Sequence, residues 1–178
     1  MLTRDDAVLL VVDVQGKLAR LMHEAQALFD NLSRLVRGAT VLRVPVVATE
    51  QNPAGLGPTV EEVRPHLPAP PLPKMAFSCL GEPAVVEALE ATGRPQVLLA
   101  GIETHICVYQ TARDLLARGG EVHVVADAVS SRAPGNREVG LAKMRAAGAE
   151  ITSVETALFE MLEAADGPAF KQILAIVK

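Results

Sequence analysis

The chain has 178 residues, of which 49% are hydrophobic and 21% are charged, and its formal net charge is −4 at pH 7. At this length about 70% of the unfolded surface can be buried on folding, so we expect a single domain over residues 1–178. Its 17 basic and 21 acidic residues are intermixed, which leaves no basic stripe for nucleic acid. The apolar run Ala7–Val12 is too short to span a bilayer, and no basic signal-peptide start precedes it. We therefore expect a cytoplasmic protein without a nucleic-acid or membrane partner.

Continuous apolar runs recur along the chain and predict strands. Runs rich in Val and Leu, without polar alternation, are typical of strands that are buried on both faces of a parallel sheet. We expect strands at Ala7–Val12, Val44–Thr49, Gln96–Ile102, Glu121–Ala126 and Glu150–Val154.

Amphipathic stretches lie between these strands and predict crossover helices. Apolar residues recur at helical spacing in Glu24–Leu42, Pro83–Thr92 and Asn136–Ala147. The segment Pro168–Lys178 has one apolar face and predicts a last helix that packs on the core. The alternation of strands and helices predicts a three-layer α/β/α sandwich around a parallel sheet.

A proline-rich segment precedes Lys74. Pro65–Pro73 contains five prolines, which exclude a helix. We interpret it as an ordered loop that positions Lys74. A lysine that leads an apolar segment is an unusual surface charge, although its stem can also run past Phe77 so that the ammonium reaches water.

Cys107 stands where a predicted strand ends and a helix begins. Thr104 is a good N-cap, which places Cys107 at the third helical position. The helix dipole and a nearby cation such as Lys74 would then lower the pKa of the thiol from about 8.5 to about 6. A free cysteine is more often a small buried hydrophobe. Cys79 lacks such a placement, and we interpret it as structural.

Asp13 follows the first predicted strand directly. It therefore lies at the carboxyl edge of the sheet, where open α/β sheets bind ligands, and Cys107 is predicted at the same edge. An acid at a strand end can also simply cap the next turn. The four histidines are scattered, and the chain has no H-E-x-x-H, C-x-x-C, G-x-G-x-x-G or phosphate-binding G-x-x-x-x-G-K-[ST] motif. We expect neither a metal nor a cofactor.

The segments around Asp13, Lys74 and Cys107 together resemble the isochorismatase-like cysteine hydrolases. These segments are Leu9–Gln15, Pro73–Ser78 and Ala100–Val108. They occur in the same order as in that family, and the similarity covers nearly the whole chain. Within the family the chain looks most like the compact, metal-free branch of unassigned substrate. At Ala48–Pro53 it lacks the aspartate and histidines with which nicotinamidases bind a metal.

The resemblance implies roles for these residues. Cys107 would be the nucleophile, Asp13 the general base and Lys74 the cation that keeps the pair ionised. A cis peptide bond would join Ile102 to Glu103, and amides near it would form an oxyanion hole with the N–H of Cys107.

The family also implies a fold and an assembly. It has a six-stranded parallel sheet, so a further strand is expected near Met75–Ser78, and its members are commonly homo-oligomers. A retained thiol favours covalent hydrolysis of a small amide or related carbonyl substrate through a thioester. Gln15, Glu50 and Thr104 are polar residues that we expect to contact this substrate.

Two other functions remain open from the sequence. The chain could be a silent scaffold that acts through oligomerisation or partner binding, with its pocket filled by a side chain such as Leu18 or Phe77. It could also be a redox sensor in which Cys79 resolves an oxidised Cys107.

Overall fold

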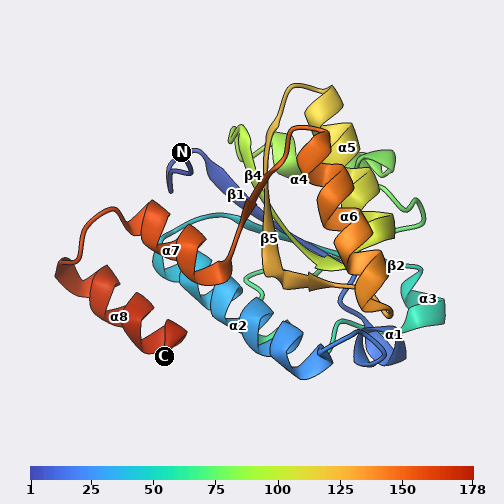
Figure 1. The fold of residues 1–178 in the computed structure, drawn as a ribbon, viewed down its shortest axis with the longest axis horizontal. Coiled ribbons are helices and arrows are strands. Elements are labelled where there is room, and N and C mark those ends of the chain that lie inside the picture. Colours follow the sequence, from blue (N-terminus) through green and yellow to red (C-terminus); the bar gives the residue numbers. More distant parts are fainter.

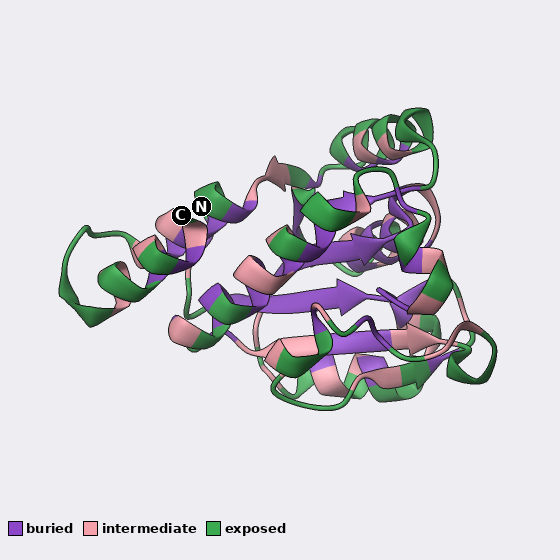
Figure 2. Cartoon of the chain, turned by 90° about the horizontal axis from the view of Figure 1, so that it is seen from below, coloured by how far each residue is buried: buried purple, intermediate pink, exposed green.

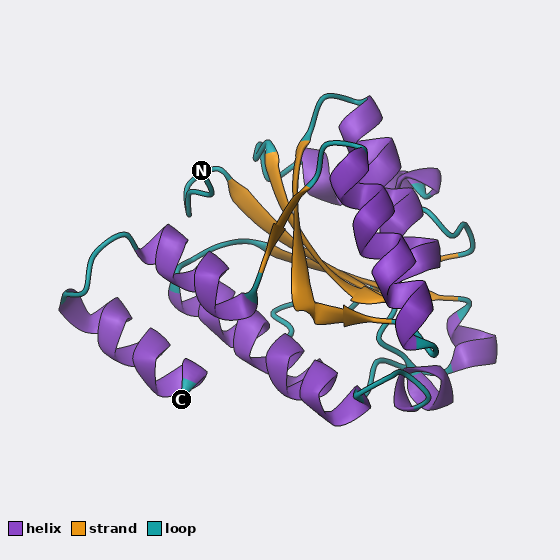
Figure 3. Cartoon of the chain, viewed as in Figure 1, coloured by secondary structure: helices purple, strands orange, loops and turns teal.

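The structure, a computed structural model, describes residues 1–178 and is built on a six-stranded, all-parallel sheet (Figure 3). The strands run in the order β3-β2-β1-β4-β5-β6. Their bounds are β1 Ala7–Val12, β2 Val46–Gln51, β3 Leu72–Lys74, β4 Gln96–Ile102, β5 Glu121–Ser130 and β6 Glu150–Thr152. The predicted α/β class and six-stranded parallel sheet are confirmed.

Helices cover both faces of this sheet, as Figure 1 shows. On one face lie α2, α7 and α8, and on the other lie α4, α5 and α6. The helices are α1 Gly16–Arg20, α2 Ala25–Val41, α3 Pro53–Leu56, α4 Pro83–Glu90, α5 Tyr109–Ala117, α6 Pro134–Ala146, α7 Val154–Leu162 and α8 Gly167–Val177. Short 3₁₀ turns lie at Arg64–His66 and Cys79–Gly81, and a π-helix at Thr104–Val108 leads into α5. None of the helices has the length and apolar character needed to cross a membrane.

The central strands β1 and β4 are buried along their whole length (Figure 2). Successive side chains of β1 point to opposite faces. Leu9 joins the core beneath α2, α7 and α8, whereas Val8 and Leu10 join the core beneath α4, α5 and α6. The unbroken apolar runs in the sequence are therefore explained by two separate cores, one on each face.

The third strand ends at Lys74, so the expected strand at Met75–Ser78 is wrong. β3 pairs with β2 in the register Thr49 to Leu72 and Gln51 to Lys74. Its proline is tolerated because β3 is an edge strand and a proline there costs no internal ladder bond. The prolines of this segment led us to predict a loop, and β3 was therefore not predicted from the sequence.

β1 and β4 are neighbours at the centre of the sheet, and their backbones approach each other closely. Gly101 has φ +115°, and a Cβ at this position would collide with the backbone of Val12. Only glycine allows this approach. Because β2 lies on one side of β1 and β4 on the other, the carboxyl ends of β1 and β4 form a topological switch point, where such sheets bind ligands.

Candidate active site

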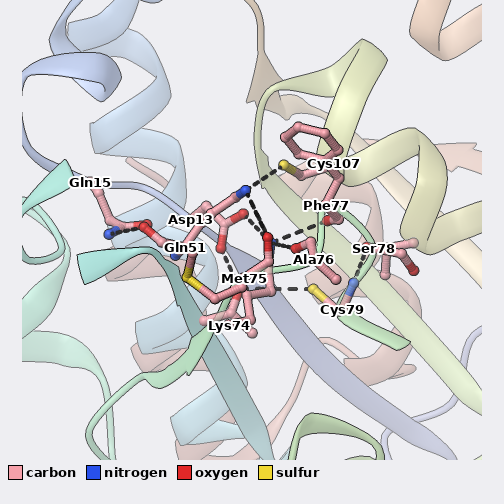
Figure 4. Close-up of polar contacts among 12 residues, drawn as sticks. Asp13, Gln15, Gln51, Lys74, Met75, Ala76, Phe77, Ser78, Cys79 and Cys107 are labelled. Atoms are coloured by element: carbon pink, nitrogen blue, oxygen red, sulfur yellow. Dashed lines mark hydrogen bonds and ion pairs between the residues drawn. The ribbon is translucent and has the colours of Figure 1, made fainter. Parts of the chain in front are cut away.

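Residues from four strand ends meet at this switch point (Figure 4). Asp13 follows β1, Gln51 ends β2 and Lys74 ends β3, whereas Cys107 lies in the π-helix after β4. Parallel strands bring their carboxyl ends to one edge of the sheet, so residues distant in the sequence become neighbours. Asp13 has φ +52°, a left-handed conformation that aspartate tolerates better than most residues.

Asp13 and Lys74 form a buried ion pair. The distance from Lys74 Nζ to Asp13 Oδ2 is 2.7 Å, and the two side chains are 0% and 4% exposed. This oxygen accepts no hydrogen bond of good geometry, so the contact is ionic. The Lys74 ammonium also donates to the carbonyl oxygens of Ala76 at 2.9 Å and Phe77 at 3.1 Å.

Thr49 supports the carboxylate from the other side. Its hydroxyl donates to Asp13 Oδ1 at 2.8 Å. Burial raises the pKa of Asp13 above its ordinary value, and the charge of Lys74 and the hydrogen bond from Thr49 lower it in part. Asp13 is therefore a stronger base than an exposed aspartate.

The Cys107 thiol is neutral at rest, contrary to the lowered pKa that its position predicts. Burial raises the pKa of Cys107 to about 12, and the charge of Asp13 adds to this, whereas Lys74 lowers it. The residue is 7% exposed, and its Sγ donates to Gln51 Oε1 at 3.2 Å. Desolvation and a neighbouring carboxylate outweigh the cation, since both disfavour the thiolate.

The turn that carries Cys107 differs from the predicted one. The residue before the helix is Glu103, in extended conformation, and Thr104 is the first residue of a π-helix rather than its N-cap. Cys107 is thus the fourth helical residue. The Thr104 hydroxyl is buried without a hydrogen-bond partner. Gly140 of α6 lets this turn pack closely, because a Cβ there would lie 2.8 Å from the Thr104 carbonyl.

The peptide bond between Ile102 and Glu103 is cis, at the position that the family resemblance implies. The Glu103 carboxylate is buried and pairs with Arg132. It accepts from the Arg132 backbone N–H at 3.0 Å and from Arg132 Nε at 3.3 Å.

A cavity of about 130 Å³ opens onto these groups. Its polar wall contains Asp13, Gln51, Glu103 and Cys107, and the rest of the lining is apolar. Leu18 and Phe77 are among the lining residues, so they border the space and do not fill it. The observation that would favour a silent scaffold is therefore not seen.

Gln15, Glu50 and Thr104 do not line this cavity, and their contact with a substrate stays a prediction. The Gln15 amide binds the backbone of Gln51 and Gly57. Glu50 accepts from the backbone and hydroxyl of Thr59 at 2.6 and 2.7 Å. Gln15 and Glu50 fix the loop that follows β2.

Gln51 is the site residue that sequence reasoning missed. Its carboxamide oxygen accepts from Cys107 and lies 3.4 Å from Lys74 Nζ, so it joins the nucleophile to the cation. A polar residue at the end of a buried strand indicates a site only weakly, because the same position often serves the following turn.

Cys79 lies behind the ion pair. It is fully buried, and its Sγ is 3.8 Å from the Thr49 hydroxyl oxygen. Both cysteines are free thiols. No group of three or more His, Cys, Asp or Glu side chains in residues 1–178 is arranged to hold a metal ion.

Comparison with known proteins establishes the family. The model of the isochorismatase domain matches residues 7–156, and the chain belongs to the isochorismatase family. The secreted isochorismatase effector Isc1 of Phytophthora sojae is 44% identical over 97% of this chain and 84% of its own length.

Solved structures share the whole fold. The MAR1 ribonuclease of Caenorhabditis elegans superposes with a TM-score of 0.93 at 35% identity, over 99% of this chain and 91% of its own. YcaC of Pseudomonas aeruginosa, with hexane-2,5-diol and covalent acrylamide, gives 0.91 at 28% identity, over 98% and 90%. YcaC of Escherichia coli, an octameric hydrolase of unknown specificity, gives 0.92 at 26% identity, over 98% and 89%.

Proposed function

We propose that this protein is a hydrolase that cleaves a C–N bond of a small amide, or a related carbonyl compound, through a covalent cysteine intermediate. The observation that carries the proposal is one cavity bordered by a thiol and by a buried carboxylate that is paired with a lysine. A nucleophile, a base and a fixed cation within one small site are the parts that acyl transfer requires.

In the first step Asp13 takes the thiol proton of Cys107 as the sulfur attacks the carbonyl carbon. The raised pKa of the thiol makes this general base necessary, because little thiolate forms spontaneously at neutral pH. The Lys74 ammonium, 2.7 Å from Asp13, compensates the charge of the Asp13–Cys107 pair during the transfer.

The tetrahedral intermediate carries a negative oxygen. We assign its stabilisation to the N–H of Cys107 and to the amides beside the Ile102–Glu103 bond, all of which belong to residues that border the cavity. The proton on Asp13 then passes to the leaving nitrogen. Asp13 next takes a proton from water as the water oxygen attacks the thioester. The C–S bond then breaks, the acid is released, and Asp13 returns its proton to the sulfur, which restores the thiol.

Two features of similar proteins support this chemistry. The P. aeruginosa YcaC structure contains covalent acrylamide, an electrophile that adds to a nucleophile through its C=C bond and so supports a reactive nucleophile in this family, and the E. coli YcaC is described as a hydrolase. The name of MAR1 describes a ribonuclease. Here the net charge is −4 and Lys74 is already engaged, so we do not propose RNA as the substrate.

We further infer self-association and a cytoplasmic location, as the sequence predicts. The octameric E. coli YcaC supports self-association, and light scattering on the purified chain tests it.

The cytoplasmic location needs a separate test, because the name of the P. sojae relative describes a secreted protein. Fractionation of the source cells is that test.

The test of the catalytic proposal is incubation with a library of small amides and esters, followed by intact-mass analysis. We expect an acyl adduct on the wild-type chain and product release, both absent from Cys107→Ser. Cys79→Ser is the matched control and should behave as wild type. An adduct of equal yield on the Cys107→Ser variant would overturn the proposal.

A further inference from the structure

The cavity beside Cys107 is small. Its volume is about 130 Å³. Sites for drug-sized ligands are larger, at about 300–1,000 Å³. The part of the substrate that enters this space therefore has only a few non-hydrogen atoms.

The far wall of the cavity is apolar. It is formed by side chains from α1, α3, the segment after β3, the end of β4 and the π-helix: Leu18, Leu56, Phe77, Ile102 and Ile106. None of these side chains can satisfy a polar group. They favour a short hydrocarbon portion of the substrate over one that carries hydroxyl or charged groups.

Every charged group at the site is already paired within the protein. Lys74 has three N–H donors, and its Nζ donates to Ala76, Phe77 and Gln51 at 2.9, 3.1 and 3.4 Å and lies 2.7 Å from the Asp13 carboxylate. No donor of this lysine remains for a substrate carboxylate. On the opposite side Glu103 is neutralised by Arg132.

An ionised substrate group would thus lose its hydration without gaining a counter-ion. An anion would also meet the carboxylates of Asp13 and Glu103, and a cation would have to displace Lys74 or Arg132. Burial of an unpaired charge is strongly unfavourable. The neutral carboxamide of Gln51 is the one uncharged side-chain amide in the lining.

We propose that the site selects an uncharged carbonyl compound with a short apolar acyl group and rejects ionised acids and amines. This inference rests on the proposed covalent chemistry at Cys107. Charged substrates are excluded because the ions at the site are already paired with one another. Long acyl groups are excluded by the apolar wall that includes Leu56.

Charge selection is tested by alkylation of the full chain with iodoacetamide and with iodoacetate, which differ in charge but not in the reacting carbon. Rates at Cys107 are measured by intact mass with peptide mapping and divided by the rates on glutathione. We expect the normalised iodoacetamide rate to exceed the iodoacetate rate at least about tenfold, since a tenfold ratio needs only about 1.4 kcal/mol of the penalty for a buried charge. Equal normalised rates would overturn the inference while leaving the covalent function intact.

Length selection is tested by comparing phenyl acetate with phenyl butanoate as acyl donors to Cys107, again normalised to glutathione, because these esters differ only in the length of the acyl group. Leu56→Ala should raise the relative rate of the longer reagent about tenfold, because a few methylene groups decide fit in such pockets. Leu21→Ala is the matched control, since Leu21 is 64% exposed and does not line the cavity. An unchanged ratio in Leu56→Ala would overturn the length assignment.

Failure of the underlying function has a different result. If no reagent modifies Cys107 in the folded chain, while the unfolded chain is modified at both cysteines, the thiol is not available for catalysis. The proposed function and this inference then fall together.

Discussion

The two edges of the sheet bury polar groups in different ways. At the amino edge Gln96 is 6% exposed, but its carboxamide is neutral and fully used. It accepts from the Thr3 N–H at 2.9 Å and donates to the Met1 carbonyl and the Glu121 carboxylate at the same distance. Arg94 of this edge donates to the Ala7 carbonyl at 3.2 Å. These bonds tie the first residues of the chain to the sheet.

The carboxyl edge instead buries full charges. Asp13 and Lys74 are almost completely removed from water, and the Thr104 hydroxyl has no partner. A buried ion pair is often no more stable than apolar residues of the same volume. The amino edge is therefore organised for stability, whereas the carboxyl edge keeps costly groups that its proposed chemistry needs.

Removal of the thiol should have the largest effect on activity. We expect Cys107→Ala to lower kcat/KM at least about 10⁴-fold, since loss of a nucleophile removes the covalent route. Cys79→Ala, which removes the other buried thiol, should leave kcat within a few-fold of wild type once the loss of stability is allowed for. Equal losses in both variants would place the chemistry elsewhere.

Removal of the buried cation should have the largest effect on stability. Lys74→Met leaves the Asp13 carboxylate without its partner, and we expect the free energy of unfolding to fall by about 3–5 kcal/mol at neutral pH. The pKa of Asp13 rises further in this variant, so the deficit should shrink as the pH falls and the carboxyl group takes up a proton. Urea unfolding at several pH values measures it.

The double variant Asp13→Asn with Lys74→Met sharpens this test. Because no unpaired charge remains, it should be more stable than Lys74→Met alone at neutral pH, and it should still be inactive. A double variant as unstable as the single one would show that packing of the lysine stem, rather than charge, dominates at this edge.

The Thr49 hydroxyl should tune the pH dependence. It lowers the pKa of Asp13, so Thr49→Val, which keeps the shape of the side chain, should raise that pKa. Asp13 must be ionised to accept the thiol proton, and the acid limb of kcat/KM should therefore move to higher pH. A limb that stays in place would exclude Asp13 as the titrating base.

A change at the amino edge should have the smallest effect. Gln96→Ala removes hydrogen bonds at the far end of the sheet, and we expect a loss of about 1–2 kcal/mol in unfolding free energy. The kcat/KM of the folded protein should not change. A large loss of activity in this variant would contradict the division of roles between the two edges.

Much of the fold and the gathering of the site residues could be predicted from the sequence. Unbroken apolar runs located five strands to within a few residues, and the strand-end position of Asp13 predicted its edge of the sheet. β3 was missed because its proline is compatible only with an edge strand, and edge position depends on the strand order. The prediction for the pKa of Cys107 had the wrong direction, because desolvation depends on the packing around the thiol.

Polar residues at and just after the carboxyl ends of strands were the hardest to assign. Gln15 and Glu50 bind loop backbone, whereas Gln51 contacts the thiol. All three have the same character in the sequence. The direction of each side chain depends on the loop that follows β2, and local pattern does not contain that information.

The most direct test of covalent catalysis is a single-turnover reaction with an activated acetyl ester, quenched in acid and mapped by mass spectrometry. The mechanism predicts one acetyl group per chain, located on Cys107, forming as the alcohol is released and disappearing as acetate appears. In Asp13→Asn both phases should slow. Hydrolysis that proceeds at the wild-type rate without any acetyl group on Cys107 would contradict the mechanism.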